Sequence, residues 1–151
     1  ADNQSQLEAL AAAVDTQEAD AVYVVGGDGT LGTVVTGILR NRENSVLPIG
    51  VFPGGYDNLS LKRLAPTVFE SSDDVRRMCE SAMALIEEQH RSIRAFELTV
   101  EGDETDRKPI YGIGDVGAGW FRHIEERRRK LWYFGAVKRR WAYIWEMLKV
   151  H

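Results

Sequence analysis

A glycine-rich turn follows the first short apolar run of the chain and carries a single carboxylate. Its residues are Gly26, Gly27, Asp28, Gly29 and Thr30. Glycines can adopt backbone angles that bring peptide N–H groups within reach of an anion. Apolar residues at helical spacing from Leu31 to Leu39 predict a helix directly after the turn, and the N-terminus of a helix favours negative charge. The turn therefore predicts a binding site for nucleotide phosphates, and a kinase is the leading hypothesis.

A purely structural interpretation of the same residues stays open. A tight connection between a strand and a helix also uses glycines, because they allow close packing, and Asp28 would then be a solvated turn residue. Thr30 is the expected cap of the helix. Five specified positions in one turn favour the phosphate site over this alternative.

A second apolar run, from Leu47 to Phe52, also ends in a glycine turn, Pro53-Gly54-Gly55. Together with the apolar run over 21–25 and the helical patterns over 7–14, 31–40 and 73–88, it makes helices and strands alternate. This alternation predicts an α/β fold with a mostly parallel sheet, in which ligands bind at the carboxyl ends of the strands. Both glycine turns are expected at such ends.

The chain offers little for a metal site or for disulfides. Its histidines, His90, His123 and His151, have no cysteine at ligand spacing, so any metal would arrive with the nucleotide. One cysteine excludes an internal disulfide framework, and Cys79 falls on the predicted core face of the helix over 73–88, for which Ser71 or Ser72 is the expected cap. No apolar stretch approaches the roughly 20 residues that a membrane span needs.

The pattern changes near residue 92. Phe96, Leu98 and Val100 alternate with polar residues, and after a polar turn the run Ile110–Ile113 predicts a return strand and hence a β-hairpin. We predict an α/β nucleotide-binding domain over 1–92 and the start of a β-rich second domain over 93–151. The glycines at 112, 114, 117 and 119 fit a bulged strand or a site lining equally well.

The last third of the chain is basic and aromatic. It holds all four tryptophans, and residues 122–149 contain nine Lys or Arg and three Glu, a net +6, although the whole chain carries −4. From Ala136 onward a helix is expected, with one face formed by Val137, Trp141, Ile144, Trp145 and Leu148. This helix would either contact an anionic membrane surface or bury its tryptophans in its own domain. Nothing in the segment supports a nucleic-acid partner.

The residues around both turns resemble a known family. Gly26–Leu31 with Val34-Val35-Thr36-Gly37, and Pro48-Ile49-Gly50 leading to Pro53, Gly55 and Asn58, are similar to the diacylglycerol and sphingosine lipid kinases. NAD kinases and phosphofructokinases share the Gly-Gly-Asp-Gly turn, and NAD kinase is the alternative enzyme, although its pattern after the turn fits poorly. Two further features, Phe121-Arg122 after Gly119 and the run 131–135, resemble the mitochondrial acylglycerol kinases within the family.

This resemblance implies a kinase that uses ATP and Mg²⁺ to phosphorylate the hydroxyl of monoacylglycerol or diacylglycerol. It implies that the nucleotide is held by Gly26, Gly27, Asp28, Gly29, Thr30, Gly54, Gly55 and Asn58. Asp28 would be catalytic, either organising Mg²⁺ or accepting the proton of the hydroxyl. Thr33 and Tyr56 depart from the family pattern, which commonly has glutamate and threonine there.

The resemblance also implies a location and a second function. It places the protein in mitochondria, at the inner membrane facing the intermembrane space, with a non-catalytic scaffold role in the mitochondrial protein import machinery as the alternative function. It puts the family's first strand upstream of Ala1 and an acidic Asp-Gly-Glu element downstream of His151. We therefore expect residues 1–151 alone to show no kinase activity.

Overall fold

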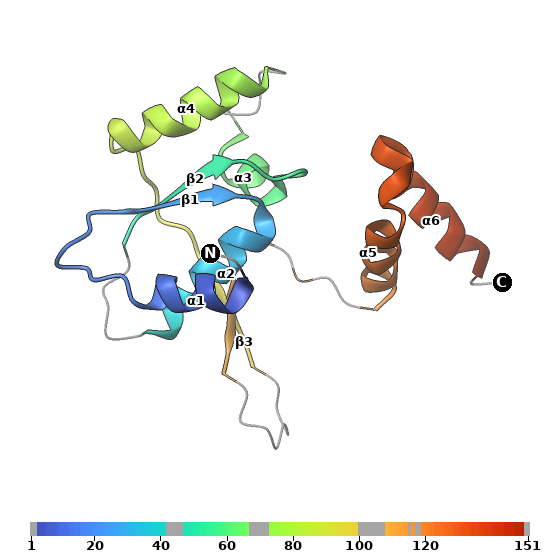
Figure 1. Cartoon of the computed structure of the whole chain (residues 1–151), viewed down its shortest axis with the longest axis horizontal. Helices are drawn as coiled ribbons and strands as arrows, with labels where there is room; N and C mark the ends of the chain where they lie inside the picture. The colour runs from blue at the N-terminus through green and yellow to red at the C-terminus, as the bar shows by residue number, and fades with distance from the viewer. Residues whose placement is uncertain are drawn as a thin grey trace. The chain divides into compact units, whose positions relative to one another are not determined.

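The computed structural model of the chain describes residues 3–41, 47–66, 73–99, 108–114, 116 and 119–149. It divides into two compact units, one over Ala1–Gly114 and one over Asp115–His151. Figure 1 labels most of their helices and strands.

The first unit is built on a parallel pair of strands. Strands β1 (Val22–Gly26) and β2 (Ile49–Pro53) pair in register from Val22 opposite Ile49 to Gly26 opposite Pro53. Helix α2 (Asp28–Arg40) lies on one side of this sheet and α4 (Asp74–Ile86) on the other, while α1 (Gln4–Ala12) packs on α2 (Figure 1). A short helix, α3 (Leu59–Leu64), follows the second glycine turn. The predicted α/β class and the parallel pairing are confirmed.

Helix α2 supplies most of the core because its apolar residues recur on the side that faces β1 and α1. The buried cluster consists of Ala11, Val24, Leu31, Val34, Val35, Ile38 and Tyr111. Gly37 lets α1 approach closely, since a Cβ at Gly37 would lie 2.6 Å from the carbonyl oxygen of Glu8. At the far end of α2, Arg40 pairs with Glu8, and its Nε donates to the carbonyl of Pro109 at 2.7 Å.

Two predicted details of the helices are wrong. Helix α2 begins at Asp28 with Gly27 as its N-cap residue, so Thr30 lies inside the first turn and is not the cap. Helix α4 is capped by Asp73, whose side chain accepts from the N–H of Val75 at 2.9 Å. The expected caps of α4, Ser71 and Ser72, lie outside the described residues.

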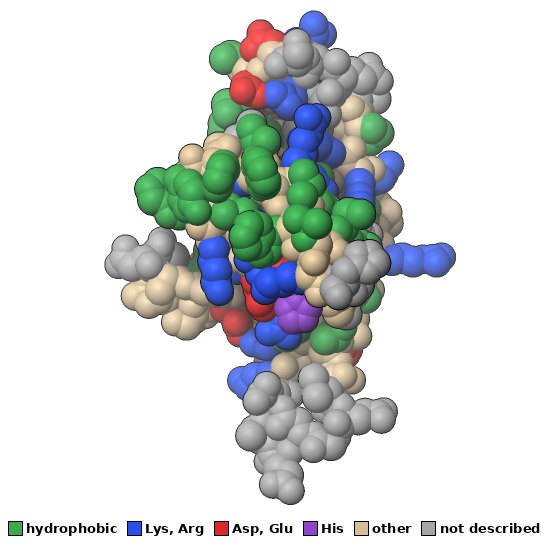
Figure 2. All heavy atoms as spheres, turned by 90° about the vertical axis from the view of Figure 1, so that its right-hand side faces the viewer, with side chains coloured by type: hydrophobic (Ala, Val, Ile, Leu, Met, Phe, Trp, Pro, Cys, Tyr) green, Lys and Arg blue, Asp and Glu red, His purple; other side chains and the backbone are tan. Residues whose placement is uncertain are grey.

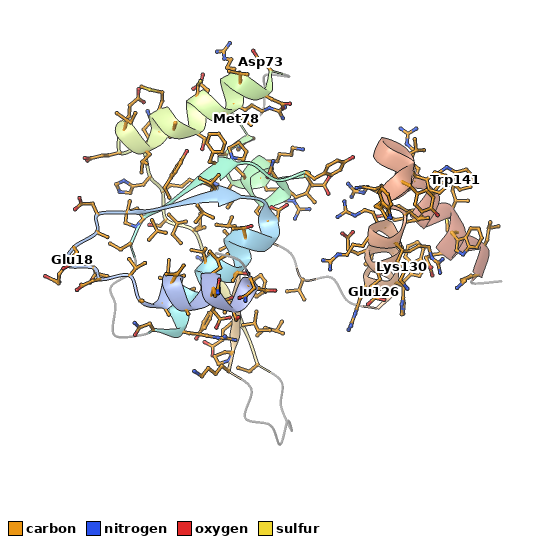
Figure 3. All side chains as sticks on the ribbon, viewed as in Figure 1. Glu18, Asp73, Met78, Glu126, Lys130 and Trp141 are labelled. Atoms are coloured by element: carbon orange, nitrogen blue, oxygen red, sulfur yellow. The ribbon has the colours of Figure 1, made fainter. Side chains whose placement is uncertain are left out.

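The orientation of α4 also differs from the prediction, because Cys79 is exposed. The buried residue of α4 is Ser81, whose hydroxyl donates to the carbonyl of Val51 in β2. Figure 3 shows Asp73 at the start of α4 and Met78 on the side of the helix nearer the sheet. A polar contact to the strand therefore sets which face of α4 turns inward.

The predicted hairpin is confirmed. Strands β3 (Phe96–Leu98) and β4 (Ile110–Gly112) pair antiparallel, with Phe96 opposite Gly112. A Cβ at Gly112 would lie 2.5 Å from the Phe96 ring, so this glycine is explained by packing. The hairpin belongs to the first compact unit and packs on α2, while the domain boundary expected after residue 92 stays a prediction.

The second unit is helical throughout its described part. It consists of α5 (Trp120–Lys130), the 3₁₀ helix η2 (Trp132–Val137) and α6 (Lys138–Lys149). The helix expected after Ala136 is confirmed as α6, whereas α5 was not predicted. The chain kinks within η2 at Gly135, whose φ of 53° is a conformation that glycine adopts readily. Across the parts of the chain that the structure describes, no helix combines the length and apolar character of a membrane span.

Candidate phosphate-binding site

The two glycine turns lie in direct backbone contact at the carboxyl ends of β1 and β2. The N–H of Gly54 donates to the carbonyl of Gly26 at 3.1 Å. A Cβ built on Gly55 would lie 2.3 Å from the Cα of Gly27, a distance that no side chain tolerates. The glycines at 27 and 55 are therefore required by the close approach of the two turns. The structure brings Gly26, Gly27, Gly54 and Gly55 together at the strand ends, and their role in holding a nucleotide stays a prediction.

The N-terminus of α2 emerges from this paired turn. The first N–H groups of a helix have no partners within the helix and are available to an anion. Gly27, the N-cap residue, makes no side-chain cap bond, and the space around Gly29 is open, since a Cβ built there would meet no atom within 4 Å apart from its chain neighbours and the nearby backbone of its own helix. The geometry therefore suits a bound phosphate.

Asp28 connects the starts of α2 and α3. Its Oδ2 accepts from the N–H of Leu59 at 2.9 Å and its Oδ1 from the N–H of Ser60 at 2.7 Å. Partial burial by itself would raise the pKa of this carboxyl. Hydrogen bonds from the backbone of Ser60 and Leu59 outweigh that effect and hold the pKa below its ordinary value of 3.8. Asp28 is therefore ionised at neutral pH and ties the second glycine turn to the first.

Asn58 closes the second turn on itself. Its Oδ1 accepts from the N–H of Gly55 at 3.0 Å, and its Nδ2 donates to the carbonyls of Gly55 at 2.8 Å and Pro53 at 3.3 Å. Its backbone is left-handed, with φ of 47°, a conformation that asparagine adopts more readily than most residues. These bonds engage both ends of the side-chain amide, so the structure gives Asn58 a role in shaping the turn.

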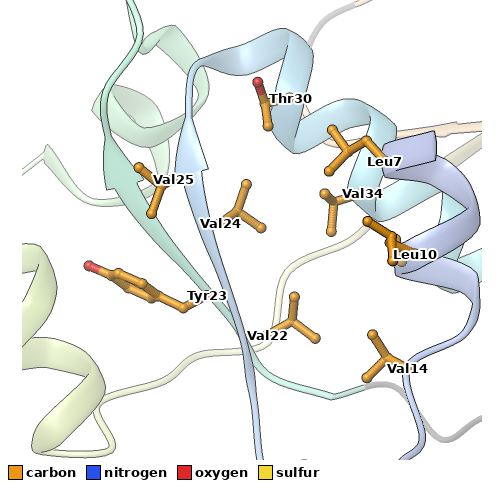
Figure 4. Close-up of a pocket in the computed structure, with 10 residues that line it drawn as sticks. Leu7, Leu10, Val14, Val22, Tyr23, Val24, Val25, Thr30 and Val34 are labelled. Carbon is orange, nitrogen blue, oxygen red and sulfur yellow. The ribbon is translucent and has the colours of Figure 1, made fainter. Parts of the chain in front are cut away.

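Thr30 and Gly26 pack against each other, because a Cβ on Gly26 would lie 2.7 Å from the Thr30 hydroxyl oxygen. The Thr30 side chain lines a hollow of about 220 Å³ between α1, β1 and α2 (Figure 4). The hollow is otherwise lined by Leu7, Leu10, Ala11, Val14, Val22, Tyr23, Val24, Val25 and Val34. Thr30 thus offers the site its backbone N–H in the first turn of α2, while its side chain borders this largely apolar space.

The two positions that depart from the family pattern behave differently. Thr33 is buried, and its hydroxyl donates to the carbonyl of Gly29 in the same helix at 3.0 Å. The Tyr56 side chain, beside the second glycine turn, is 70% exposed. Thr33 therefore acts within α2, and Tyr56 leaves the contact between the turns unobstructed.

The described residues contain no group of three or more His, Cys, Asp or Glu that could hold a metal ion. Asp28 lies in the first of the paired turns and Asp57 follows the second, and each oxygen of Asp28 already accepts a backbone N–H. A metal at the paired turns would therefore take few of its ligands from the described side chains.

Sequence reasoning missed the partners of Asp28. Leu59 and Ser60 lie 31 and 32 residues further along the chain, and only their N–H groups take part. The sequence does contain a signal for this contact. A short helix that begins after the turn residue Asn58 presents its first N–H groups to a nearby acceptor.

Comparison with known proteins defines the class of this fold and site. The diacylglycerol kinase catalytic domain family matches residues 1–98, and the chain belongs to that family. It is 70% identical over 149 residues, 99% of the chain, to an uncharacterized protein of Caenorhabditis elegans. It is 30% identical over 137 residues, 88% of the chain, to the mitochondrial acylglycerol kinase of Homo sapiens, and 28% identical over 136 residues, again 88% of the chain, to that of Xenopus laevis.

The chain spans about a third of the length of these relatives, with 34%, 31% and 30% of each covered in the same order. No solved structure matches the chain.

Proposed function

We propose that the protein is a lipid kinase that transfers the γ-phosphate of ATP to the free hydroxyl of monoacylglycerol or diacylglycerol, giving lysophosphatidic or phosphatidic acid. The observation that carries this proposal is the backbone contact between the two glycine turns beside the N-terminus of α2. The family match and the similarity to mitochondrial acylglycerol kinases support the substrate class.

The chain's own residues would position the reactants. Phosphoryl transfer depends mainly on positioning and on stabilising charge, which peptide N–H groups and a magnesium ion supply well. The N–H groups at Gly29 and Thr30 would hold phosphate oxygens, and Gly27, Gly54 and Gly55 would let the phosphates come close to the backbone. ATP supplies the phosphoryl group when it is bound.

Asp28 is proposed as the residue that keeps this site in shape. Its two backbone hydrogen bonds and lowered pKa support a positioning role or a role in organising Mg²⁺. A general base works best with a pKa near the working pH, so the same features argue against Asp28 as the acceptor of the hydroxyl proton.

A charge change at Gly29 tests the phosphate site. In the complete protein we expect Gly29→Glu to lower ATP affinity by about 10- to 10²-fold, because it places a carboxylate where a phosphate would bind and each lost charge-assisted bond costs about 1.5–3 kcal/mol. The fold should survive, since the space at Gly29 is open and an acidic residue in the first turn of a helix is favourable. Calorimetric titration with Mg-ATP measures the affinity.

Gly29→Gln is the matched control, with the same size and no charge. It should bind ATP more tightly than Gly29→Glu and melt at a similar temperature. Phosphorylation of monoacylglycerol, diacylglycerol and NAD by the wild type, followed with labelled ATP, identifies the acceptor. A Gly29→Glu protein that binds ATP like the wild type would show that the phosphates lie elsewhere.

We further propose a mitochondrial location, which is supported by relatives named as mitochondrial acylglycerol kinases. Placement at the inner membrane facing the intermembrane space, and a scaffold role in the protein import machinery, remain proposals that rest on the family resemblance. Rescue of an import defect by the Gly29→Glu protein, with no lipid phosphorylation, would support a separate scaffold role.

A further inference from the structure

The helical unit exposes an aromatic patch that runs from η2 along one face of α6. The patch consists of Trp132, Tyr133, Phe134, Val137, Trp141, Ile144, Trp145 and Leu148, all exposed, with Trp132 at 76% and Leu148 at 71%. Its rings form a chain of contacts: centroid distances are 6.0 Å from Trp132 to Tyr133, 4.8 Å from Tyr133 to Phe134 and 6.0 Å from Phe134 to Trp141. A contiguous exposed apolar surface of this kind marks an interaction site.

The interior of the helical unit does not use this patch. Ile124 of α5 and Ala142 and Glu146 of α6 are its buried residues among those described. Arg127 pairs with Glu146 between the helices, and Trp120 meets Tyr143 edge to face at 6.1 Å. The interpretation in which the tryptophan stripe of α6 is buried is therefore not realised within the described residues.

The unit carries more basic than acidic side chains, nine Lys or Arg against three Glu over residues 122–149. Each of the three acids lies in an ion pair within the unit, Glu125 with Arg128, Glu126 with Arg122 and Glu146 with Arg127. Residues 122–149 nevertheless carry a net +6. Figure 2 shows apolar side chains gathered together with Lys and Arg side chains beside them, and Figure 3 shows Lys130 on α5 and Trp141 on α6.

We propose that this helical unit binds the surface of an anionic lipid bilayer, with the aromatic patch at headgroup level and the basic side chains against lipid phosphates. Trp and Tyr favour the boundary between headgroups and acyl chains. Basic residues are attracted to anionic lipid. All three acids are already paired with arginines of the same unit, and the remaining excess of positive charge complements an anionic lipid surface better than the mixed charges of a typical protein partner. The proposal concerns binding and does not depend on phosphoryl transfer.

Sedimentation of the complete protein with vesicles tests the proposal. The vesicles contain phosphatidylcholine alone or phosphatidylcholine mixed with phosphatidylglycerol, at about 0.05 and about 0.5 M salt, which spans strong and weak screening. We expect the wild type to bind the anionic vesicles at low salt and to lose much of this binding at high salt. Tryptophan emission should shift to the blue on binding, because exposed rings enter the headgroup layer.

Two variants and one matched control assign the binding to this surface. Lys130→Ala/Arg139→Ala/Arg140→Ala, which removes three exposed charges, should weaken partitioning by about 10- to 10²-fold. Trp132→Ala should weaken it and reduce the blue shift. The control Arg76→Ala/Arg91→Ala/Arg94→Ala removes three exposed charges from the first unit and should bind like the wild type.

Several results would overturn the proposal. One is that the wild type binds vesicles equally well with and without anionic lipid. Another is that the triple variant and its control lose the same amount of binding. The tryptophan emission could also be blue-shifted before any vesicles are added and be unchanged by Trp132→Ala. That result would mean that the patch is already covered by protein. A stoichiometric complex with a second protein that the same variants abolish, without vesicle binding by the wild type, would assign the surface to a protein partner. Phosphorylation of acylglycerol in neutral detergent micelles is measured separately, so failure of the proposed kinase activity is recognisable on its own.

Discussion

Asp28 illustrates how one side chain serves both the fold and the candidate site. The N-terminus of α2 favours negative charge, and the Asp28 carboxylate is itself a negative group at that end of the helix. Its hydrogen bonds to Leu59 and Ser60 direct it toward α3, which leaves the N–H groups of the next α2 residues for a ligand. The same residue therefore fixes the relative position of the two turns.

The lowered pKa of Asp28 predicts a pH dependence of stability. The hydrogen bonds favour the ionised form in the folded protein, so their contribution is present above the ordinary value of 3.8 and is lost as the pH falls through the lower, folded-state pKa. We expect Asp28→Asn to melt about 2–5 °C below the wild type at neutral pH. The difference should shrink below about pH 4. Thermal unfolding followed by circular dichroism across this range measures it.

Asp20→Asn, at an exposed carboxyl outside the site, is the control and should melt like the wild type. Kinetics on the complete protein then separate the roles of Asp28. A positioning role lowers ATP affinity along with turnover, whereas a general base lowers turnover by about 10²–10⁴ with affinity and melting temperature unchanged. The second result would contradict our assignment.

At the level of elements, α2 is the connection between the site and the rest of the first unit. Its N-terminus borders the glycine turns, its middle packs on α1 at Gly37, and its buried Thr36 joins the hairpin. The Thr36 hydroxyl donates to the Tyr111 carbonyl at 2.8 Å and accepts from the Tyr111 N–H at 3.2 Å. A threonine that looks like part of a family motif thus has a structural reason to be there.

Thr36→Val tests this connection. The two side chains have nearly the same shape, but valine removes both hydrogen bonds between the Thr36 hydroxyl and the backbone of Tyr111, which costs about 1–3 kcal/mol. Thr33→Val is the matched control, because Thr33 is equally buried and its hydroxyl bonds only within its own helix. Urea unfolding should show a clear decrease in the free energy of unfolding for Thr36→Val and a decrease below about 1 kcal/mol for Thr33→Val. Equal losses would mean that the bonds to Tyr111 contribute nothing specific.

The elements that the sequence predicts well are those with a strong period and clear breakers. The apolar runs before Gly26 and Pro53 identify both strands, and the glycines after them indicate the candidate site, because these signals are local. Helix α5 escaped prediction because its apolar positions, such as Phe121 and Ile124, are few among many charged residues. The inward face of α4 was predicted wrongly because the bond from Ser81 to Val51, 30 residues away, outweighs the local pattern around Cys79.

The candidate site also has some features that the sequence predicts and others that it does not. Which glycines meet could be anticipated from the strand ends, since parallel strands place both turns at one edge of the sheet. The distance of 3.0 Å between a Cβ on Gly27 and the Cα of Gly55 could not be anticipated, nor could the tie from Asp28 to α3. Both depend on how segments far apart in sequence approach in space, and no local pattern encodes that.

At the level of the whole molecule, the chain combines two compact units with different chemistry. The first holds the glycine turns, and the second holds the basic aromatic surface. A kinase whose acceptor is a lipid needs both a phosphate site and access to a membrane, and this chain places the candidates for them in separate units. The charge is unevenly distributed as well, since residues 122–149 carry +6 in a chain with a net −4.

The distribution of tryptophan makes this division measurable. All four tryptophans lie at or after Trp120, within the second unit, so their fluorescence reports on that unit, while far-ultraviolet circular dichroism reports on both. In the 151-residue chain we expect Thr36→Val to lower the melting temperature of the first unit, as seen by circular dichroism. The decrease should be about 4–8 °C for each kcal/mol by which the free energy of unfolding falls. The tryptophan transition should stay within about 1 °C of the wild type, because the lost bonds lie entirely in the first unit. Paired thermal scans of wild type, Thr36→Val and Thr33→Val decide the matter. A tryptophan transition that moves together with the dichroism would mean that the two units unfold as one, so that a change in the first unit also affects the second.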